Sequence, residues 1–448
     1  MLDFAKDLLE RHYCRPNETV EAAFKRACDC FGSDAAHSKR LQEYIKKEWF
    51  MFSSPILSNA PAAGEKVKGL PISCFLTYVP DTIKGLCDHT TEERWLSVKG
   101  GGVGGHWSSV RAISDQTPGV NGFLHTVDAD MVAYRQGKTR RGSYAAYMDV
   151  SHPEIEEFIA MRKTTGGDLN RKCLNLHNAV NITNEFLDAV RDDLSWRLID
   201  PKTKTAVKNV SARDLWWQII HTRSETGEPY IVNLDNCNDA LPKEQKDLGL
   251  EIRQSNLCSE ITLPTNEERT AVCCLSSVNL EKFDEWSTDS LFIDDLVTML
   301  DNVIEHFIEN AVDTDELGTY RANADRFKNH IKEGMNGYKK STYSAYRERS
   351  IGLGAMGFHS YLQSKGIPFE GMYASSFKTE RLTLSKLKQL TQVKDLLKKG
   401  AKHLIWLVAD YVMLISWLLL LTLLVPLYVM VQALVLSLQG LMCILTKR

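Results

Sequence analysis

The chain has 448 residues, 44% of them hydrophobic and 25% charged, which is enough for about two or three domains' worth of core. Its 54 basic and 57 acidic residues give a net charge of −3, and this near balance argues against a general nucleic-acid binder, which would carry a basic stripe. Eleven cysteines without a secretory signal before them indicate a reducing cytoplasm, where thiols are catalytic, metal-binding or inert.

The first two thirds of the chain contain two patterns. Residues 1–50 are predicted to be helical, because their apolar side chains recur at helical intervals. Residues 51–275 alternate short β-branched runs with helical stretches such as 155–162 and 212–222. That alternation is typical of a parallel α/β fold.

Two β-rich runs contain cysteine. Leu70–Tyr78 holds Cys74, and Ala271–Leu280 holds Cys273 and Cys274. Two thiols brought together in a protein supply two electrons when they form a disulfide. These runs are therefore candidates for a dithiol site.

Glycine-rich and polar segments lie between the two runs. Residues 99–105 are glycine-dense enough for the backbone to approach a ligand closely, although such a run alone is more often a flexible loop. The run is not a G-x-G-x-x-G between a strand and a helix, so a dinucleotide-binding fold is not indicated. Residues 164–172 read as a polar turn. His106 and His152 are expected in loops or at the surface.

The segment Arg253–Pro264 carries the most informative motif, an amide, a thiol and a carboxylate at alternate positions: Asn256, Cys258 and Glu260. In an extended backbone these three side chains share one face. Cys258 has no neighbouring histidine, so it suits one-electron chemistry better than a Cys–His nucleophile, with Glu260 as general base and Asn256 as orienter. The alternative is a small buried thiol on a half-wet strand.

The last part of the chain changes character. Residues 290–365 are predicted to be mostly helical. Residues 378–402 carry eight Lys or Arg against two acids, and residues 404–446 are almost wholly apolar. The apolar stretch is long enough for two membrane-spanning helices divided near Pro426, since one span needs about 20 residues. A membrane anchor and read-through into unrelated sequence both remain open.

Together these segments resemble the large, catalytic subunit of class I ribonucleotide reductase, which makes deoxyribonucleotides from ribonucleotides. The resemblance runs from about Phe50 to Gln363. It rests on the stretch 255–261, on the cysteine that follows it, and on Ser73-Cys74 upstream. The implied fold is α/β: part of a ten-stranded α/β barrel, with the first half-barrel and a central finger loop, an N-terminal helical region and an apolar helical C-terminal tail.

The resemblance implies four segments. We expect an N-terminal helical region at 1–50, the partial barrel at 51–370, a basic linker or amphipathic helix at 371–403, and the membrane-type tail at 404–446.

The resemblance also implies a role for each residue of the motif. Cys258 is the thiyl-radical residue that abstracts the substrate 3′-hydrogen. Glu260 takes the 3′-hydroxyl proton, and Asn256 hydrogen-bonds the sugar. The activity implied is that of a ribonucleoside-diphosphate reductase.

Further residues receive roles in the same way. Cys74 and Cys273 are the implied reducing pair that ends as a disulfide, and Cys274 is expected to serve packing, because adjacent strand residues face opposite ways. The implied substrate-binding residues are Ser54, Ser73, Gly101 and Gly102. The implied binding residues for the nucleoside triphosphate effector are Asp81, Arg111 and Arg171.

The implied partners follow from the same family. They are a radical-generating small subunit that holds a dimetal centre of the iron type, a thioredoxin- or glutaredoxin-type reductant, and a second copy of the large subunit. No metal or cofactor is expected on this chain itself. A cytoplasmic location is expected, with membrane association through the tail and without nucleic-acid binding.

The resemblance ends after residue 370, and a second half with its tyrosine pair and terminal cysteine pair is not found. We therefore interpret the chain as the N-terminal portion of a split or interrupted, phage-type large subunit that needs a separate C-terminal half. A half-barrel alone exposes a sheet edge and an apolar face, so the isolated chain is expected to be unstable, aggregation-prone and inactive. The alternative is a catalytically inactive, membrane-associated truncated remnant.

Overall fold

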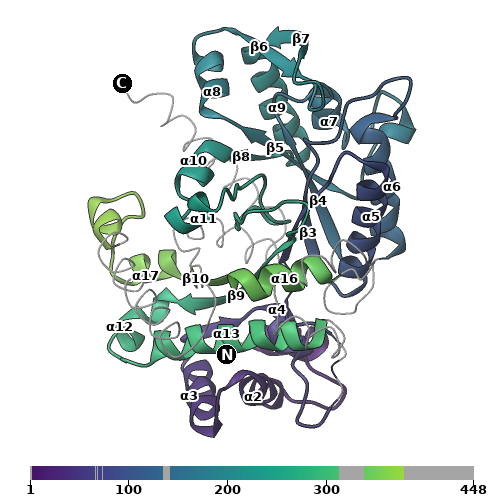
Figure 1. Cartoon of the computed structure of the whole chain (residues 1–448). Helices are drawn as coiled ribbons and strands as arrows, with labels where there is room; N and C mark the ends of the chain where they lie inside the picture. The colour runs from purple at the N-terminus through teal and green to yellow at the C-terminus, as the bar shows by residue number, and fades with distance from the viewer. Residues whose placement is uncertain are drawn as a thin grey trace.

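An eight-stranded sheet forms the centre of the fold, in the order β1-β9-β2-β3-β4-β5-β8 with β10 paired to β9 (Figure 1). The structure is a computed structural model that describes residues 3–65, 67, 69–72, 74–134, 142–311 and 338–377. The strands of the sheet are β1 (Phe50–Phe52), β2 (Cys74–Tyr78), β3 (Gly102–His106), β4 (Ser143–Asp149), β5 (His177–Ile182), β8 (Tyr230–Asn233), β9 (Ala271–Asn279) and β10 (Ile351–Met356). A separate hairpin consists of β6 (Ser195–Ile199) and β7 (Ala206–Ser211).

The sheet contains two units of opposite direction. Strands β2, β3, β4, β5 and β8 are parallel neighbours. Strand β9 runs antiparallel to β2, and β10 runs parallel to β9. The predicted α/β fold with a half-barrel is confirmed, and two strands of a second unit are present beside it. In the described part of 290–365 most residues are helical, as predicted, and β10 is a strand that was not predicted there.

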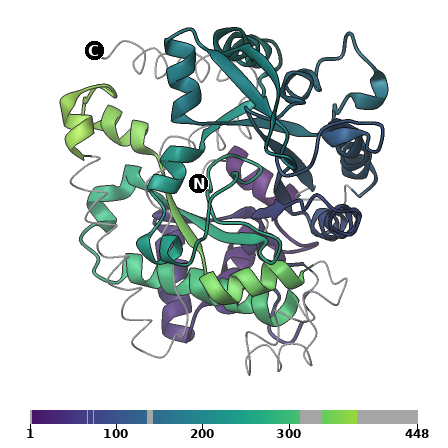
Figure 2. The same cartoon turned by 45° about the horizontal axis from the view of Figure 1, so that its top comes forward.

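Helices surround the sheet. Helix α5 contacts β3, α6 contacts β4, and α7 contacts β4 and β5, so these three helices cover the outer face of the sheet. Viewed from two directions, α13 and α16 lie at the opposite end of the molecule from α8 and α9 (Figures 1 and 2). The α-helices are α1 (Asp3–His12), α2 (Val20–Phe31), α3 (Ala35–Lys46), α4 (Ser54–Asn59), α5 (Ile83–Val98), α6 (Gly119–Ala133), α7 (Ile155–Ala160), α8 (Asn184–Arg191), α9 (Ala212–Thr226), α10 (Leu234–Asp239), α11 (Lys243–Asp247), α12 (Phe283–Trp286), α13 (Phe292–Ala311), α16 (Lys339–Glu348) and α17 (Phe358–Ser364), and the 3₁₀ turns are η1 (Leu169–Arg171) and η2 (Leu280–Lys282).

Side-chain caps explain where several of these helices begin. A Ser, Thr or Asp oxygen accepts a backbone N–H of the first turn, which satisfies a donor that has no partner inside the helix. This arrangement occurs at the start of α2, α3, α5, α8 and α9, through Thr19, Asp34, Thr82, Thr183 and Ser211.

The two faces of the sheet bury different side chains. Phe75, Val103 and Tyr144 point into the main core on the helix-covered side. Cys74 and Tyr147 belong to smaller buried clusters on the other, inner face. Alternation along each strand separates the two sets.

The inner face is covered by an irregular segment between α11 and β9, residues 248–270, which is called the finger loop below. In Figure 1 it runs as a teal-green trace between α11 and the strands β3 and β9. Its apolar residues Ile252, Ile261 and Leu263 are buried among side chains of the inner face. The predicted central loop carrying Cys258 therefore lies inside the curve of the sheet.

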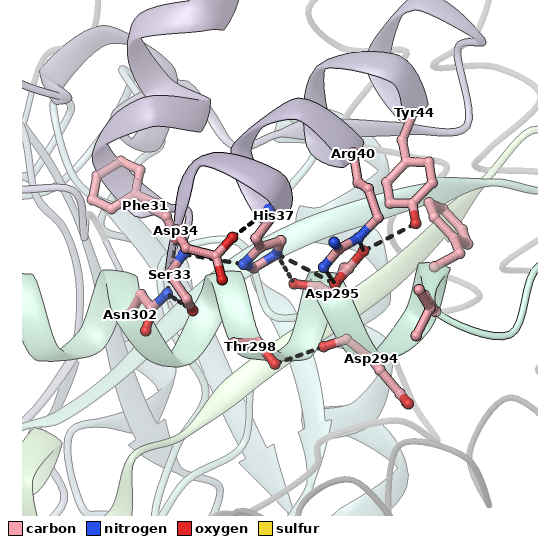
Figure 3. Close-up of polar contacts among 12 residues, drawn as sticks. Phe31, Ser33, Asp34, His37, Arg40, Tyr44, Asp294, Asp295, Thr298 and Asn302 are labelled. Atoms are coloured by element: carbon pink, nitrogen blue, oxygen red, sulfur yellow. Dashed lines mark hydrogen bonds and ion pairs between the residues drawn. The ribbon is translucent and has the colours of Figure 1, made fainter.

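A buried polar network ties the N-terminal helices to α13 (Figure 3). Arg40 of α3 donates two hydrogen bonds to the Asp295 carboxylate, each of 2.7 Å. The Tyr44 hydroxyl donates to the same carboxylate at 3.0 Å, and His37 Nε2 lies 3.0 Å from the Asp295 carbonyl oxygen. Asp295 is buried, so the network joins the N-terminal helical region to the barrel rather than leaving it as a separate appendage.

Some predictions concern residues that the structure does not describe, and another is corrected by it. Ser73 and residues 378–448, which include the predicted apolar tail, lie outside the described residues. Among the residues that are described, no helix is both long and apolar enough to cross a bilayer. His106 and His152 are not surface residues, because each is at least 97% buried.

Candidate active site

The finger loop is fastened to the sheet by a buried glutamine. Gln254 Nε2 donates to the Thr77 carbonyl oxygen of β2 at 2.8 Å. The Thr265 hydroxyl donates to Gln254 Oε1 at 2.9 Å, and Gln254 is fully buried. These bonds connect the outgoing and returning arms of the loop to one strand and so fix the base from which its tip projects.

The tip of the loop is a tight turn. The Asn256 N–H donates to the Ile261 carbonyl at 3.2 Å, and the Ser259 N–H donates to the Asn256 carbonyl at 3.2 Å. Ser259 has a φ of 63°, in the left-handed region. The predicted extended backbone, with Asn256, Cys258 and Glu260 on one face by alternation, was therefore wrong, and the turn itself groups these residues.

Asn256 closes this turn with its side chain. Its Oδ1 accepts the N–H of Glu260 at 3.0 Å and the N–H of Ile261 at 3.1 Å. Its Nδ2 is buried and has no hydrogen-bond partner within the described part of the chain. Burying an amide donor without a partner costs free energy, so such a group is a candidate for binding a ligand.

A glycine in β3 allows the loop to approach the sheet. A Cβ at Gly104 would lie 2.2 Å from the Ser255 carbonyl oxygen and 2.9 Å from Asn256 Cα, both backbone atoms. A side chain at this position is therefore incompatible with the observed path of the loop. The glycine-rich run was predicted to approach a ligand, and that stays a prediction; the close approach observed at Gly104 is to the chain's own loop.

Cys74 and Cys273 are directly opposite each other on the antiparallel strands β2 and β9. Both are buried and belong to one cluster with Ile261 and Leu263 of the finger loop. Cys274 points the other way into the main core, as the alternation of a strand requires. The structure thus brings together the two predicted partners and separates Cys274 from them.

The surroundings of Cys273 favour its protonated form. Burial raises the pKa of Cys273 well above its usual value, and the nearby Cys74, Cys274 and Glu260 raise it further. Since the thiolate is the disfavoured form, Cys273 is held as a thiol at neutral pH and can deliver hydrogen as well as electrons.

Cys258 is partly buried at the tip of the loop, close to β8. Burial is the main cause of the raised pKa of the Tyr230 hydroxyl, and the Glu228 carboxylate and then the Cys258 sulfur raise this pKa further. The Tyr230 ring also stacks on His177, with 6.3 Å between ring centroids. The Cys258 sulfur is therefore near enough to the Tyr230 hydroxyl to affect it electrostatically, and the sequence did not single out this tyrosine.

The remaining predicted substrate-binding residues have different surroundings. Gly102 is the strand neighbour of Cys74 and lies directly beside the cysteine pair. A side chain at Gly101 would meet the Leu96 carbonyl at 2.7 Å, on the side of α5. Ser54 begins α4, where its hydroxyl lies 3.2 Å from that of Tyr13.

Two predicted effector-binding residues are bonded to each other. Arg111 Nε donates to the Asp81 carboxylate at 2.8 and 3.0 Å. Asp81 also lines a cleft of about 410 Å³ at the C-terminal ends of β2, β3 and β4, together with Tyr78, His106 and Asp149. Ligands of open α/β sheets commonly bind at this edge.

Arg171, the third predicted effector residue, lies in a different polar cluster. It forms ion pairs with Glu154 at 2.8 Å and with Glu157, and it donates to the Pro118 carbonyl at 2.8 Å. The two carboxylates, Glu157 before Glu154, raise the pKa of Arg171, so its guanidinium is charged. Its N–H groups are already engaged in the contacts just described.

Comparison with known proteins identifies the family. The family model described as "Ribonucleotide reductase, barrel domain" matches residues 72–393. The chain belongs to this family. A solved structure, the Actinobacillus ureae class Id ribonucleotide reductase alpha subunit, superposes with a TM-score of 0.73 at 26% sequence identity, covering 89% of this chain and 68% of that one.

Viral members of the ribonucleotide reductase family are similar in sequence. The ribonucleoside-diphosphate reductase large subunit described for Frog virus 3 (isolate Goorha) is 54% identical over 333 residues, or 74% of this chain and 54% of the relative. The large subunit of Invertebrate iridescent virus 3 is 40% identical over 413 residues, or 80% of this chain and 60% of the relative. The chain thus spans between about half and three fifths of the length of these relatives.

Within this ribonucleotide reductase barrel, sequence reasoning missed several residues that support the loop. Tyr147 bonds to the tip, Gln254 fastens its base, and Tyr230 borders Cys258. Tyr147 lies in an ordinary strand pattern that gives no signal of a polar role. Gly104 belongs to the recognised glycine run, and only its contact with Ser255 distinguishes it.

Mild oxidation of the full chain is expected to join Cys74 to Cys273. Residues directly opposite on antiparallel strands have Cα atoms about 4.5–5.5 Å apart, within the range that a disulfide spans. Peptide mapping after treatment with diamide should detect this link in the wild type and in Cys274→Ser, and lose it in Cys273→Ser. A dominant Cys74–Cys274 link would contradict the assignment.

Proposed function

We propose that this chain is the catalytic-subunit component of a ribonucleoside-diphosphate reductase. The observation that carries the proposal is the position of Cys74 opposite Cys273, beneath a loop tip that presents Asn256, Cys258 and Glu260. One redox pair, one further thiol, one carboxylate and one amide donor are the groups that reduction of a ribose carbon by a radical route requires.

Each group has a defined task. A thiyl radical on Cys258 takes the substrate 3′-hydrogen atom and becomes a thiol. Glu260 accepts the 3′-hydroxyl proton and later returns it to the 3′ oxygen, while the 2′-hydroxyl takes one proton from the cysteine pair and leaves as water. The buried Nδ2 of Asn256 donates to a sugar hydroxyl and keeps the reacting carbon in place.

The cysteine pair completes the reaction. Cys74 and Cys273 together give two electrons and two protons and form a disulfide; one proton goes to the departing 2′-hydroxyl and the other to the 2′ carbon. Cys258 returns a hydrogen atom to the 3′ carbon and is again a radical. The high pKa of Cys273 supports this direction, since a thiol carries the hydrogen that the substrate needs. A thioredoxin- or glutaredoxin-type protein restores the dithiol.

The radical comes from outside the chain. A separate small subunit with a dimetal centre, iron being the expected metal, supplies the oxidising equivalent for Cys258. A nucleoside triphosphate effector at Asp81 and Arg111, with Arg171 as a further contact, and pairing of two large subunits belong to the same proposal.

A separate C-terminal half is part of this proposal. Within the described sheet, β8 and β10 are end strands with one paired edge each, and strands from a second polypeptide would close the barrel between them. The four segments 1–50, 51–370, 371–403 and 404–446 are proposed as the organisation of the chain, and membrane contact of the last one stays a prediction.

The test is ribonucleotide reduction by the full chain mixed with the second half and the small subunit. We expect deoxyribonucleotide formation that is lost in Cys258→Ser and kept in Cys87→Ser, because Cys87 is exposed on α5 and remote from the motif. Absence of product from a folded, complete assembly would instead favour the catalytically inactive remnant.

A further inference from the structure

Two hydroxyl groups lie directly behind the turn that carries Cys258. The Tyr147 hydroxyl of β4 donates to the Asn256 carbonyl oxygen at 2.5 Å, and it lies 2.9 Å from the Ser259 hydroxyl. Tyr147 is fully buried on the inner face of the sheet. A rigid strand is thereby bonded to the residues on both sides of Leu257 and Cys258.

The direction of these bonds follows from the number of protons. A phenol has one proton, and the Asn256 carbonyl can only accept, so the Tyr147 proton lies in that bond. The Ser259 hydroxyl must then donate to the Tyr147 oxygen. Both hydroxyl protons are thus used in hydrogen bonds. Removing the Ser259 hydroxyl takes away the bond that the Tyr147 oxygen accepts, and removing the Tyr147 hydroxyl leaves the Ser259 hydroxyl without its acceptor.

The backbone at Ser259 explains why the turn requires such support. Its φ of 63° is in the left-handed region, which residues with a Cβ seldom adopt. The Ser259 N–H bond to the Asn256 carbonyl and its hydroxyl bond to Tyr147 both hold this conformation. On the neighbouring strand β3, the Gly104 backbone also lies against the loop, at Ser255 and Asn256, and leaves no room for it to move closer to the sheet.

We propose that Tyr147 and Ser259 are positioning residues for Cys258, which fix the turn and thereby the direction of its thiol. Neither residue has a role in the reaction described above, so both act through the backbone of the tip. The inference rests on the proposed function only for the reaction that the thiol performs. The positioning itself is testable without any reductase activity.

The same geometry predicts that the hydrogen bonds from Tyr147 and Ser259 that hold the turn do not depend on pH. Burial raises the pKa of the Tyr147 hydroxyl well above its usual value, so the group stays protonated and remains a donor throughout the neutral range.

Alkylation of Cys258 by iodoacetamide tests the inference on the full chain. In Tyr147→Phe we expect the rate of Cys258 modification, followed by peptide mass spectrometry, to rise about fivefold, as expected for the loss of one buried hydrogen bond. Ser259→Ala should raise it similarly, because alanine removes the hydroxyl and keeps a Cβ at the same backbone conformation. The exposed Cys87 provides a reference rate in every variant.

Matched controls separate positioning from general loosening. Tyr361→Phe removes a comparable hydroxyl, which donates to Asp284 at 2.9 Å on α17, and should leave Cys258 unchanged. The fully buried Cys173 reports on the whole fold. If Tyr147→Phe exposes Cys173 as well, Ser259→Ala decides the question, because Ser259 is only partly buried. An unchanged Cys258 rate with Cys173 protected would overturn the inference.

Discussion

Gly104→Ala is expected to lower the free energy of unfolding by about 3 kcal/mol, at the upper end of the usual range for overpacking a core. The same substitution should displace the finger loop. The added methyl would lie 2.2 Å from the Ser255 carbonyl oxygen. That oxygen belongs to backbone and not to the end of a flexible side chain, so the methyl cannot be accommodated by a rotamer change. The strand cannot move away either, because β3 is paired on both edges, with β2 and with β4.

Urea unfolding of the full chain measures the first effect, and the alkylation rate of Cys258 measures the second. Gly371→Ala is a suitable control, since the nearest atom to its added methyl would be 3.1 Å away and belongs to Pro368, remote from the loop. If Gly104→Ala were as stable as the wild type with Cys258 unchanged, the close packing of loop and strand would not exist in solution.

The sequence was sufficient to predict the fold class and the grouping of the cysteines. The alternation of strand and helix patterns indicated a parallel sheet, and the opposite facing of neighbouring strand residues correctly separated Cys273 from Cys274. The α/β class follows from local periodicity, which a single sequence contains, whereas the half-barrel and the pairing of Cys74 with Cys273 rather than Cys274 came from the resemblance to the family.

The shape of the finger loop was not predictable in the same way. Alternation suggested an extended backbone at 256–260, whereas the tip is a turn with Ser259 in the left-handed region. Serine carries no local signal for that conformation. The turn is imposed by tertiary contacts with Tyr147 and Gly104, which lie on neighbouring strands of the inner face, and both strands come more than 100 residues earlier.

Histidine burial was missed for a related reason. His106 and His152 were expected in loops or at the surface. His152 does lie in a loop, but both are buried, and His152 Nε2 lies 2.8 Å from the Val110 carbonyl oxygen, a bond that satisfies it inside the core. Long-range partners of this kind decide whether a polar side chain is buried, and they leave no trace in the neighbouring sequence.

Asn256 offers the second large effect, because its two ends have separable tasks. Its Oδ1 holds the turn through the N–H groups of Glu260 and Ile261, while its Nδ2 is the donor proposed for the sugar. Asn256→Asp keeps an oxygen for the two N–H groups and removes the donor. In the reductase assay we therefore expect kcat to fall about 100-fold, the usual order for loss of one aligned donor.

Both Asn256→Ala and Asn256→Asp should lose activity, but only Asn256→Ala should also lose stability. Without an acceptor, the N–H groups of Glu260 and Ile261 lose their partner, which is expected to lower the free energy of unfolding by about 2 kcal/mol. The alanine variant should also give faster alkylation of Cys258, whereas the aspartate variant should keep the wild-type rate. Retained activity in Asn256→Asp would exclude Nδ2 as the substrate donor, and equal alkylation in both variants would show that the turn does not depend on Oδ1.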